Sequence, residues 1–286
     1  MSALDVRKTY KLYLGGEFVR SESGHYDPLL DAKGRTRANI CRGSRKDLRD
    51  AVGKARAVQE KWAGMSGYLR GQILYRMAEM MESRVPAFET ALRGSGLAAA
   101  AARREVRASI DRIVHFAGWS DKYQAILSSV NPVASPYFDF SSPEPTGVVG
   151  IAAPEGPALL GLVSHVLPVI VSGNSCVVLL SESDPIPGLE WAEVLATSDL
   201  PGGVVNLLSG PRSETLPHLA RHMDVNALAL AGLPKAAEIA ARQDAAVNVK
   251  RVATYAFEDY DAERVERIDL IRSFIEIKTT WHPVGW

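Results

Sequence analysis

Cysteine is scarce in this sequence of 286 residues, and neither sign of charge is in excess. Two cysteines are too few for a disulfide framework, which favours a reducing compartment. Lysine plus arginine and aspartate plus glutamate each total 33, so the formal net charge is zero. A balanced charge provides no general attraction to nucleic acid or to an anionic membrane, so neither is expected as a partner.

Long apolar runs are also missing. The first residues lack the apolar core of a signal peptide, and the longest apolar stretch, residues 158–172, is too short to span a bilayer. We therefore expect a cytoplasmic protein. His218 and His222 have a metal-compatible spacing on a predicted helix, but no third ligand accompanies them. We predict a solvent-facing pair of histidines and no metal site.

Turn formers and helical periodicity organise the first half of the chain. Residues 10–42 are rich in turn residues, which predicts hairpins or extended arms. Ser44 is a candidate N-cap for a helix that carries apolar residues at helical spacing up to Trp62. Two further helices are predicted over residues 68–93 and 98–124.

Prolines distinguish residues 131–147 from the segments on either side. Pro136, Pro143 and Pro145 surround a short aromatic stretch that begins at Tyr137. Because proline cannot donate a hydrogen bond to a strand ladder, this composition predicts an edge strand or an exposed flap and not a central strand.

From residue 148 onward, short apolar strands alternate with helices. This alternation predicts an α/β fold with a doubly wound parallel sheet. The strands are expected at residues 148–152, 175–180, 204–208, 226–231 and 248–254, and the helices at 158–172, 188–197, 214–221 and 234–242.

Five segments stand out in their order along the chain: Leu14–Phe18, Phe116–Asp121, the loop sequence of residues 145–157, residues 173–178, and Ile271–Trp281. In this order they resemble the aldehyde dehydrogenase superfamily. The resemblance implies a Rossmann-like parallel sheet with an N-terminal helical lead-in and an oligomerisation arm, with the catalytic domain missing. It divides the chain into residues 1–130 (arm and helices of the cofactor-binding domain), 131–147 (flap strand), 148–255 (Rossmann-like sheet), 256–270 (short linker in place of the catalytic domain) and 271–286 (C-terminal oligomerisation strand).

The family's catalytic motifs are altered at the positions that this chain aligns with them. The family loop Pro-Trp-Asn-Phe-Pro, whose Asn amide contributes to an oxyanion hole, reads Ala-Pro-Glu-Gly-Pro here, with Glu155 at the Asn position. A carboxylate accepts hydrogen bonds and would repel an oxyanion. Tyr255 occupies the position of the family's general base, and an unperturbed phenol is a poor base at neutral pH.

The family's cofactor motifs are only partly kept. In the ribose-binding motif Lys-Pro-Ala-Glu, Glu182 persists but Leu179 replaces the lysine. In the pyrophosphate-binding turn, Gly232 persists. Leu233 and Pro234 replace hydroxyl residues, and Pro234 also removes a backbone N–H. Glu182 and Gly232 are therefore the two candidate cofactor-binding residues, and a helix-capping or solvated carboxylate is the favoured interpretation of Glu182.

No nucleophile is evident, so we assign no catalytic residue. Neither Cys41 nor Cys176 follows the last sheet strand, where the family's thiol would lie. Cys176 is predicted to be a small buried hydrophobic residue, and Cys41 an unreactive thiol.

Two functions follow from the resemblance. The first is a non-catalytic homologue, or pseudoenzyme, without a cofactor. It would act as an interaction subunit that binds an aldehyde dehydrogenase subunit, or itself as a homodimer, through the flap and the C-terminal strand. The chain looks like the truncated, cysteine-free second domain of aldehyde dehydrogenase family sixteen, and the tail Trp281–Trp286 fits that comparison. The alternative is an oxidoreductase or dinucleotide-binding protein that uses NAD or NADP.

Overall fold

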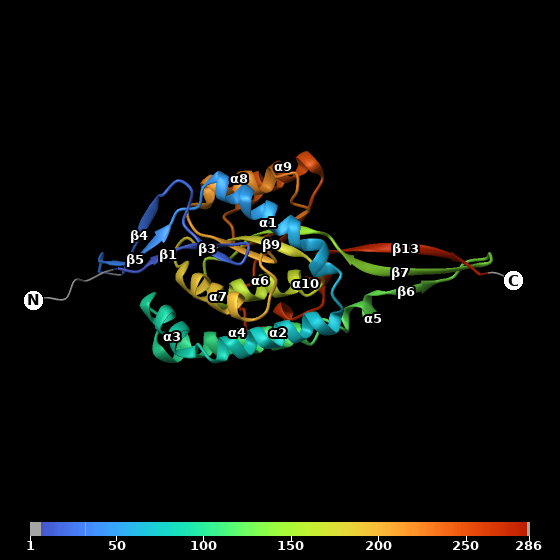
Figure 1. Cartoon of the computed structure of the whole chain (residues 1–286), viewed down its shortest axis with the longest axis horizontal. Coiled ribbons are helices and arrows are strands. Elements are labelled where there is room, and N and C mark those ends of the chain that lie inside the picture. The colour runs from blue at the N-terminus through green and yellow to red at the C-terminus, as the bar shows by residue number, and fades with distance from the viewer. Residues whose placement is uncertain (1–6, 32, 285–286) are drawn as a thin grey trace, which may run out of the picture.

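A seven-stranded sheet lies at the centre of the computed structural model, which describes residues 7–31 and 33–284 (Figure 1). Its order is β12-β11-β8-β9-β10-β2-β3, and the first strand of the parallel part, β8, has its successors on both sides. The predicted α/β fold with a parallel sheet is confirmed. The parallel strands are β8 (Val148–Ala152), β9 (Ser175–Leu179), β10 (Val205–Leu208), β11 (Ala227–Ala231) and β12 (Arg251–Tyr255).

The turn-rich beginning of the chain forms hairpins, as predicted. Strands β2 (Leu12–Leu14) and β3 (Glu17–Val19) join the sheet beside β10 in antiparallel orientation. Their two-residue turn is Gly15-Gly16, and both glycines have positive φ, which suits a tight hairpin turn. The strands β1 (Thr9–Tyr10), β4 (Tyr26–Leu30) and β5 (Thr36–Cys41) form a small separate sheet.

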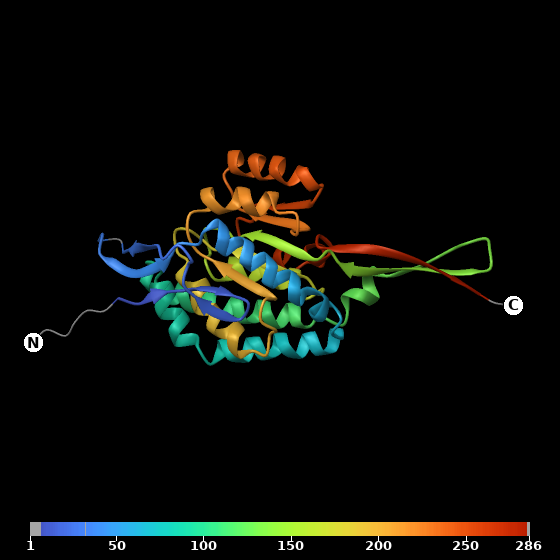
Figure 2. The ribbon, with the colours of Figure 1, turned by 45° about the horizontal axis from the view of Figure 1, so that its top comes forward.

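Helices cover both faces of the central sheet (Figure 2). One face carries α1 (Arg45–Ala63), α8 (Arg212–Arg221) and α9 (Lys235–Ala245), and the other carries α6 (Leu160–Ile170) and α7 (Ile186–Thr197). Every residue of α6 is buried, because α4 (Ala99–Ala117) packs on its outer side. The sequence of α6 is apolar except for Ser164 and His165, which reflects this burial on all sides. None of the helices in the described ranges is long and apolar enough to cross a membrane.

The start of α1 confirms the predicted N-cap. The Ser44 hydroxyl accepts a hydrogen bond from the Asp47 amide at 3.2 Å, and the Asp47 carboxylate accepts one from the Ser44 amide at 2.8 Å. This reciprocal pair satisfies two amides that the helix leaves without partners. Asp47 is buried and also accepts a hydrogen bond from the Ser21 hydroxyl, so the cap attaches the N-terminal arm to the helical layer.

Two of the predicted helices are wrong in their extent. The helix predicted over residues 68–93 is two helices, α2 (Gly67–Glu82) and α3 (Val85–Gly94), because Pro86 lies in the first turn of α3, where its missing N–H is not needed. The helix predicted over residues 98–124 ends at Ala117, and a turn separates α4 from α5 (Tyr123–Leu127).

A third sheet extends away from the body of the protein (Figures 1 and 2). We call this sheet the flap; it consists of β6 (Ser129–Asn131), β7 (Tyr137–Pro145) and β13 (Ile275–Pro283). Strand β7 lies in its middle, so the prediction of an edge strand is wrong. Pro143 and Pro145 are tolerated because β6 pairs only with residues 139–141 of β7, and the prolines lie where β7 has a single neighbour. The tail residues Gly285 and Trp286 lie outside the described residues.

Residues 256–274, which connect β12 to β13, fold back on α4 and α6. Tyr260 and Val265 are buried in this segment, which also contains η2 (Glu263–Val265) and α10 (Asp269–Arg272). Tyr260 donates to or accepts from His165 of α6 at 3.0 Å, and the His165 ring stacks on Phe257. Burial lowers the pKa of His165 to about 3, so the imidazole is neutral at physiological pH.

Arg112 of α4 attaches this segment to the body of the protein. Its side chain is 2% exposed, and it donates hydrogen bonds to the carbonyls of Tyr260 and Val265 at 2.7 and 3.2 Å. It also donates to the Ser164 hydroxyl at 2.7 Å and forms an ion pair with Glu266 at 3.2 Å. Arginine keeps its charge when buried and needs several acceptors, and residues 260–266 provide three of them.

Substituting Arg112→Ala is expected to lower the free energy of unfolding by about 3 kcal/mol, because buried acceptors lose their charged partner. The measurement is equilibrium denaturation in urea. The matched control is Arg107→Ala on the same helix, where the side chain is 70% exposed and the loss should stay below about 0.5 kcal/mol. Equal effects of the two substitutions would contradict the assigned role of Arg112.

Candidate functional site

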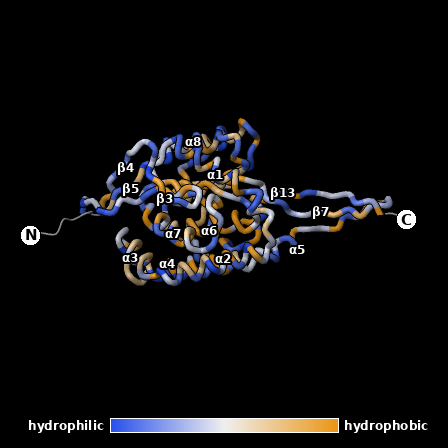
Figure 3. Tube along the Cα trace, in the orientation of Figure 1, coloured by the Kyte–Doolittle hydropathy of each residue, from blue (hydrophilic) through white to orange (hydrophobic). Residues whose placement is uncertain are grey.

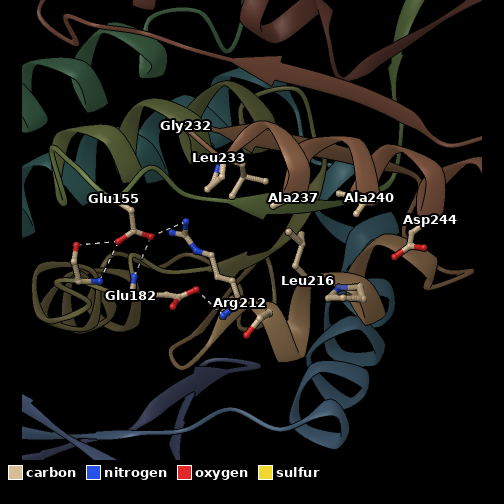
Figure 4. A pocket seen from close by; sticks show the side chains of 14 residues that line it. Glu155, Glu182, Arg212, Leu216, Gly232, Leu233, Ala237, Ala240 and Asp244 are labelled. Carbon is tan, nitrogen blue, oxygen red and sulfur yellow. Dashed lines mark hydrogen bonds and ion pairs between the residues drawn. The ribbon is translucent and has the colours of Figure 1, made fainter.

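A cavity of about 610 Å³ opens at the carboxyl ends of the parallel strands, between α8 and α9 (Figure 4). Glu155 follows β8, Glu182 follows β9, Arg212 begins α8 after β10, and Gly232 follows β11. In doubly wound sheets, ligands bind at this edge, where the strand order reverses around the first strand. The cavity is therefore the candidate binding site of the chain.

Arg212 closes one side of the cavity. Its buried guanidinium donates hydrogen bonds to the Leu180 carbonyl at 2.9 and 3.1 Å, donates to the Ala153 carbonyl, and forms an ion pair with Glu155 at 2.8 Å. Burial lowers the pKa of Arg212, but arginine remains charged in proteins. The guanidinium thus ties together the ends of β8 and β9, and its donors are used within the protein.

Sequence reasoning did not identify Arg212. The helix was predicted to start at residue 214, which left Arg212 in a loop, whereas α8 starts at Arg212 itself. Arg212 follows Gly210-Pro211 directly, and this short sequence matches no recognisable motif. Its role depends on carbonyls of two other strands, and no spacing in the sequence indicates those contacts.

Glu155, which the sequence resemblance aligns with the family's oxyanion-hole amide, is held by several donors. The carboxylate accepts hydrogen bonds from the hydroxyls of Ser181 and Ser183, both at 2.9 Å, and from the Ser183 amide at 3.0 Å. Burial alone would raise the pKa of Glu155, but the hydrogen bonds from Ser183 and the charge of Arg212 outweigh it and hold the pKa below its ordinary value. Glu155 is therefore a fixed anion at neutral pH.

Glu182 and Gly232, the two residues predicted to bind a cofactor, line the same cavity. The Glu182 carboxylate accepts a hydrogen bond at 2.8 Å from the Arg212 amide, the first N–H of α8, as expected for a carboxylate at a helix N-terminus. Gly232 has a φ of 62°, and its amide donates to the Tyr255 carbonyl at 3.0 Å. The two residues are brought together, and their role in binding a cofactor stays a prediction.

The start of α9 has lost one donor for an anion. Pro234, at the N-cap, lacks an N–H, Leu233 is half-buried, and Lys235 points to Glu238 at 3.3 Å. A helix N-terminus binds phosphate through free backbone amides, and the missing N–H of Pro234 removes one neighbouring donor here.

The charges along the cavity do not fit the pyrophosphate of a dinucleotide. Glu155, Glu182 and Asp244 are the carboxylates that line it, and Arg212 is the cation among its lining residues. Because the guanidinium of Arg212 is already occupied by two carbonyls and Glu155, a pyrophosphate would face carboxylates without a free cation. We therefore derive no reaction step that passes through such a cofactor.

The remaining candidates for catalysis are buried. Burial raises the pKa of the Tyr255 hydroxyl, which makes it a poor base at neutral pH. Both thiols, those of Cys41 and Cys176, are buried, and burial raises the pKa of Cys176. The interpretation of Cys176 as a core residue is confirmed. Within residues 7–31 and 33–284, no three or more side chains of His, Cys, Asp or Glu are grouped so that they could hold a metal ion. His218 and His222 therefore belong to no such group there.

A doubly wound parallel sheet with a cavity at the carboxyl ends of its strands defines an α/β protein of the nucleotide-binding fold class. The chain belongs to the aldehyde dehydrogenase family, since the sequence model of that family matches residues 18–255. Among solved structures, an aldehyde dehydrogenase from Bacillus cereus in complex with NAD+ has a TM-score of 0.83 at 23% identity, over 87% of this chain and 51% of that one. The fold of the two chains is therefore shared.

Curated relatives agree with the family assignment. Cytosolic 10-formyltetrahydrofolate dehydrogenase of Mus musculus is 29% identical over 256 residues, which is 87% of this chain and 28% of that protein. The mitochondrial benzaldehyde dehydrogenase of Antirrhinum majus is 31% identical over 248 residues, which is 85% of this chain and 46% of that protein. The chain thus spans less than half the length of both relatives.

Substituting Glu155→Gln is expected to lower the free energy of unfolding at pH 7 by about 1 kcal/mol. The side chain is 45% exposed, and solvent screening keeps the effect small. Because the folded state holds the pKa below its ordinary value, the stabilisation is present above about pH 4.5 and is lost as the pH falls through the folded pKa.

The measurement is urea denaturation of both proteins between pH 7 and pH 3. The difference between them should shrink as the pH falls, and Glu258→Gln, at an exposed position, serves as the control. A difference that stays constant down to pH 3 would show that the charge of Glu155 does not matter.

Proposed function

We propose that this chain is a non-catalytic member of the aldehyde dehydrogenase family that acts as an interaction subunit. Its partner is an active aldehyde dehydrogenase subunit, with a second copy of this chain as the alternative partner, and the flap is the contact surface. The arrangement corresponds to the truncated second domain of aldehyde dehydrogenase family sixteen. This chain contains Cys41 and Cys176, so it is not free of cysteine. What it shares with that domain in this proposal is the lack of a catalytic cysteine.

The segment after β12 is the observation that carries the proposal. The family match ends at Tyr255, and β13 begins at Ile275. In this proposal, residues 256–274 stand where the family's catalytic domain would be inserted. These residues pack on α4 and α6 through Arg112, Tyr260 and Val265. This packing supports the proposal, because the segment is attached to the body of the protein along α4 and α6.

The absence of a reactive group in the cavity supports the same conclusion. Oxidation of an aldehyde in this family's manner needs a nucleophile whose adduct can release hydride. Cys176 lies inside a buried strand, and Cys41 is buried next to the N-terminal arm. Neither sulfur lines the cavity, whereas Glu155 does, and the sequence resemblance aligns Glu155 with the family's oxyanion donor.

The flap supports the role in binding. It projects from the body and exposes apolar side chains along its length, and Figure 3 shows hydrophobic segments there as well as in the core. The exposed fractions are 67% for Val130, 47% for Phe138, 56% for Ile277 and 55% for Trp281. Strands at the edge of a small sheet also present unpaired N–H and C=O groups, which favours pairing with another chain.

The flap substitutions Ile277→Lys and Trp281→Glu together are expected to weaken association at least tenfold, because charges would enter an apolar contact. Association is measured by light scattering after size-exclusion chromatography, first with the chain alone and then with an active aldehyde dehydrogenase subunit. Met223→Lys is the control, since Met223 is 67% exposed and lies outside the flap. A protein that remains monomeric and binds no such subunit would contradict the proposal.

The purified chain is expected to show no oxidation of aldehydes, measured by NADH absorbance, and the double substitution Cys41→Ser with Cys176→Ser should change nothing. In calorimetry, NAD and NADP should give no Kd below about 1 mM. Micromolar binding, or turnover that the cysteine substitutions abolish, would favour the alternative function of a dinucleotide-dependent oxidoreductase.

A further inference from the structure

A second cavity, of about 730 Å³, lies between the beginning of α1 and the end of α8. The two helices pack against each other on one face of the central sheet (Figure 1). Among the described residues, none lines both this cavity and the one at the carboxyl ends of the parallel strands. Its volume falls within the range of roughly 300–1,000 Å³ that is typical of small-molecule sites, so it is large enough for a ligand.

Basic side chains dominate the lining of this second cavity. Arg45, Lys46 and Arg49 come from the first turns of α1, and Arg221 comes from the last turn of α8. Glu22 is the one carboxylate among the described residues that line it. Cations that two helices bring together repel one another unless an anion lies between them. The excess of positive charge therefore favours an anionic ligand.

Two arginines of α1 are available for such a ligand. Among the residues that the structure describes, none forms a hydrogen bond or an ion pair with the side chain of Arg45. Arg49 pairs with its neighbour Asp50 at 3.1 Å, and both side chains are largely exposed. An exposed pair of this kind contributes little to stability, so Arg49 can turn to a ligand at a small cost.

The other two cations are held in place by carboxylates and still keep donors. The Arg221 guanidinium donates to Asp244 of α9 through Nε at 2.8 Å and forms an ion pair with it through Nη2 at 2.7 Å, which leaves Nη1. Lys46 pairs with Glu22 at 3.2 Å, and an ammonium group has three donors. These contacts orient the two side chains without using all of their hydrogens.

His218 and His222 add imidazole donors to the lining from α8. Both rings line the cavity and are partly exposed. The Nδ1 atom of His222 accepts a hydrogen bond from the Asp224 amide at 3.2 Å, so the neutral ring carries its proton on Nε2. An N–H group at this position can donate to an anionic oxygen. The two histidines therefore lie at an anion cavity, and their spacing on the helix needs no metal to explain it.

Side chains, and not the backbone amides at the start of α1, form the anion-binding surface. The capping box already uses the amides of Ser44 and Asp47, and the Asp47 carboxylate is buried beneath this turn. Guanidinium groups bind phosphate through two parallel N–H donors, which a carboxylate-capped helix end does not offer. The recognition is therefore expected to come from the arginines.

We propose that this cavity binds a small ligand that carries two phosphate groups with free ends. Arg45 and Arg49 hold one group from α1, and Arg221 holds the other from α8 together with His218 and His222. The phosphates of a dinucleotide such as NAD are diesters with less charge and no free end, so weak binding of NAD stays the expected result. The inference rests on this cavity alone and is independent of the proposed function of the flap.

Calorimetric titration of the full chain with pyrophosphate, fructose bisphosphate and inorganic phosphate tests this inference. At least one of the two doubly phosphorylated probes is expected to bind about tenfold more tightly than inorganic phosphate, because it reaches cations of both helices. The tighter of the two shows whether the groups are adjacent, as in an inorganic ligand, or separated by an organic part. Equal affinity for all three probes would overturn the proposal, as would the absence of heat at millimolar concentration.

The substitution Arg45→Gln locates the site. It is expected to weaken binding of the tighter probe about tenfold, because a charge-assisted pair with phosphate is lost. The matched control is Lys61→Gln, which removes the same charge from an exposed position of the same helix that does not line the cavity. Equal losses in the two variants would show a general effect of charge and contradict the inference.

The substitution Glu22→Gln gives an effect of the opposite sign. It removes the carboxylate of the lining and releases Lys46, so binding of the same probe should become about threefold tighter. Glu17→Gln, at a side chain that is 75% exposed and outside the cavity, should leave the affinity unchanged. Thermal unfolding shows whether each variant is folded. Weaker binding in a folded Glu22→Gln protein would contradict the inference.

Discussion

The contacts of one buried guanidinium, that of Arg112, determine how this chain closes on itself. They hold residues 260–266 against α4 and α6, so the face of the helical layer that would otherwise be open is covered by the protein's own backbone. Tyr260 and Phe257 then enclose the neutral ring of His165. Because buried charges are stable only with several acceptors, the position of this segment is closely defined. After this segment, the chain continues into β13 of the flap.

A second buried guanidinium, that of Arg212, defines the cavity in the same way. It links the ends of β8 and β9 and fixes Glu155 as an anion. Among the described residues, the lining of the cavity at this edge of the sheet thus carries three carboxylates, and its one cation, Arg212, is already paired. These charges differ from those that a pyrophosphate requires.

Much of the fold could be predicted from sequence, because the parallel strands are short apolar runs bounded by turn residues. The strand at residues 148–152 was predicted with the bounds observed for β8, and β9 to β12 differ by at most three residues. The helix over residues 68–93 was mispredicted because apolar spacing continues across the break before Pro86. Glu182 and Gly232 were identified through motif positions, whereas Arg212 was missed because its partners, Leu180 and Ala153, are 32 and 59 residues away.

The central claim is that residues 256–270 form a packed part of the body and replace a catalytic domain. Hydrogen–deuterium exchange of the isolated chain tests it most directly, since exchange rates report local opening. Amides of residues 260–266 are expected to exchange about as slowly as those of α4 and α6, against which they pack. Complete exchange of this segment within seconds, with α4 and α6 still protected, would contradict it.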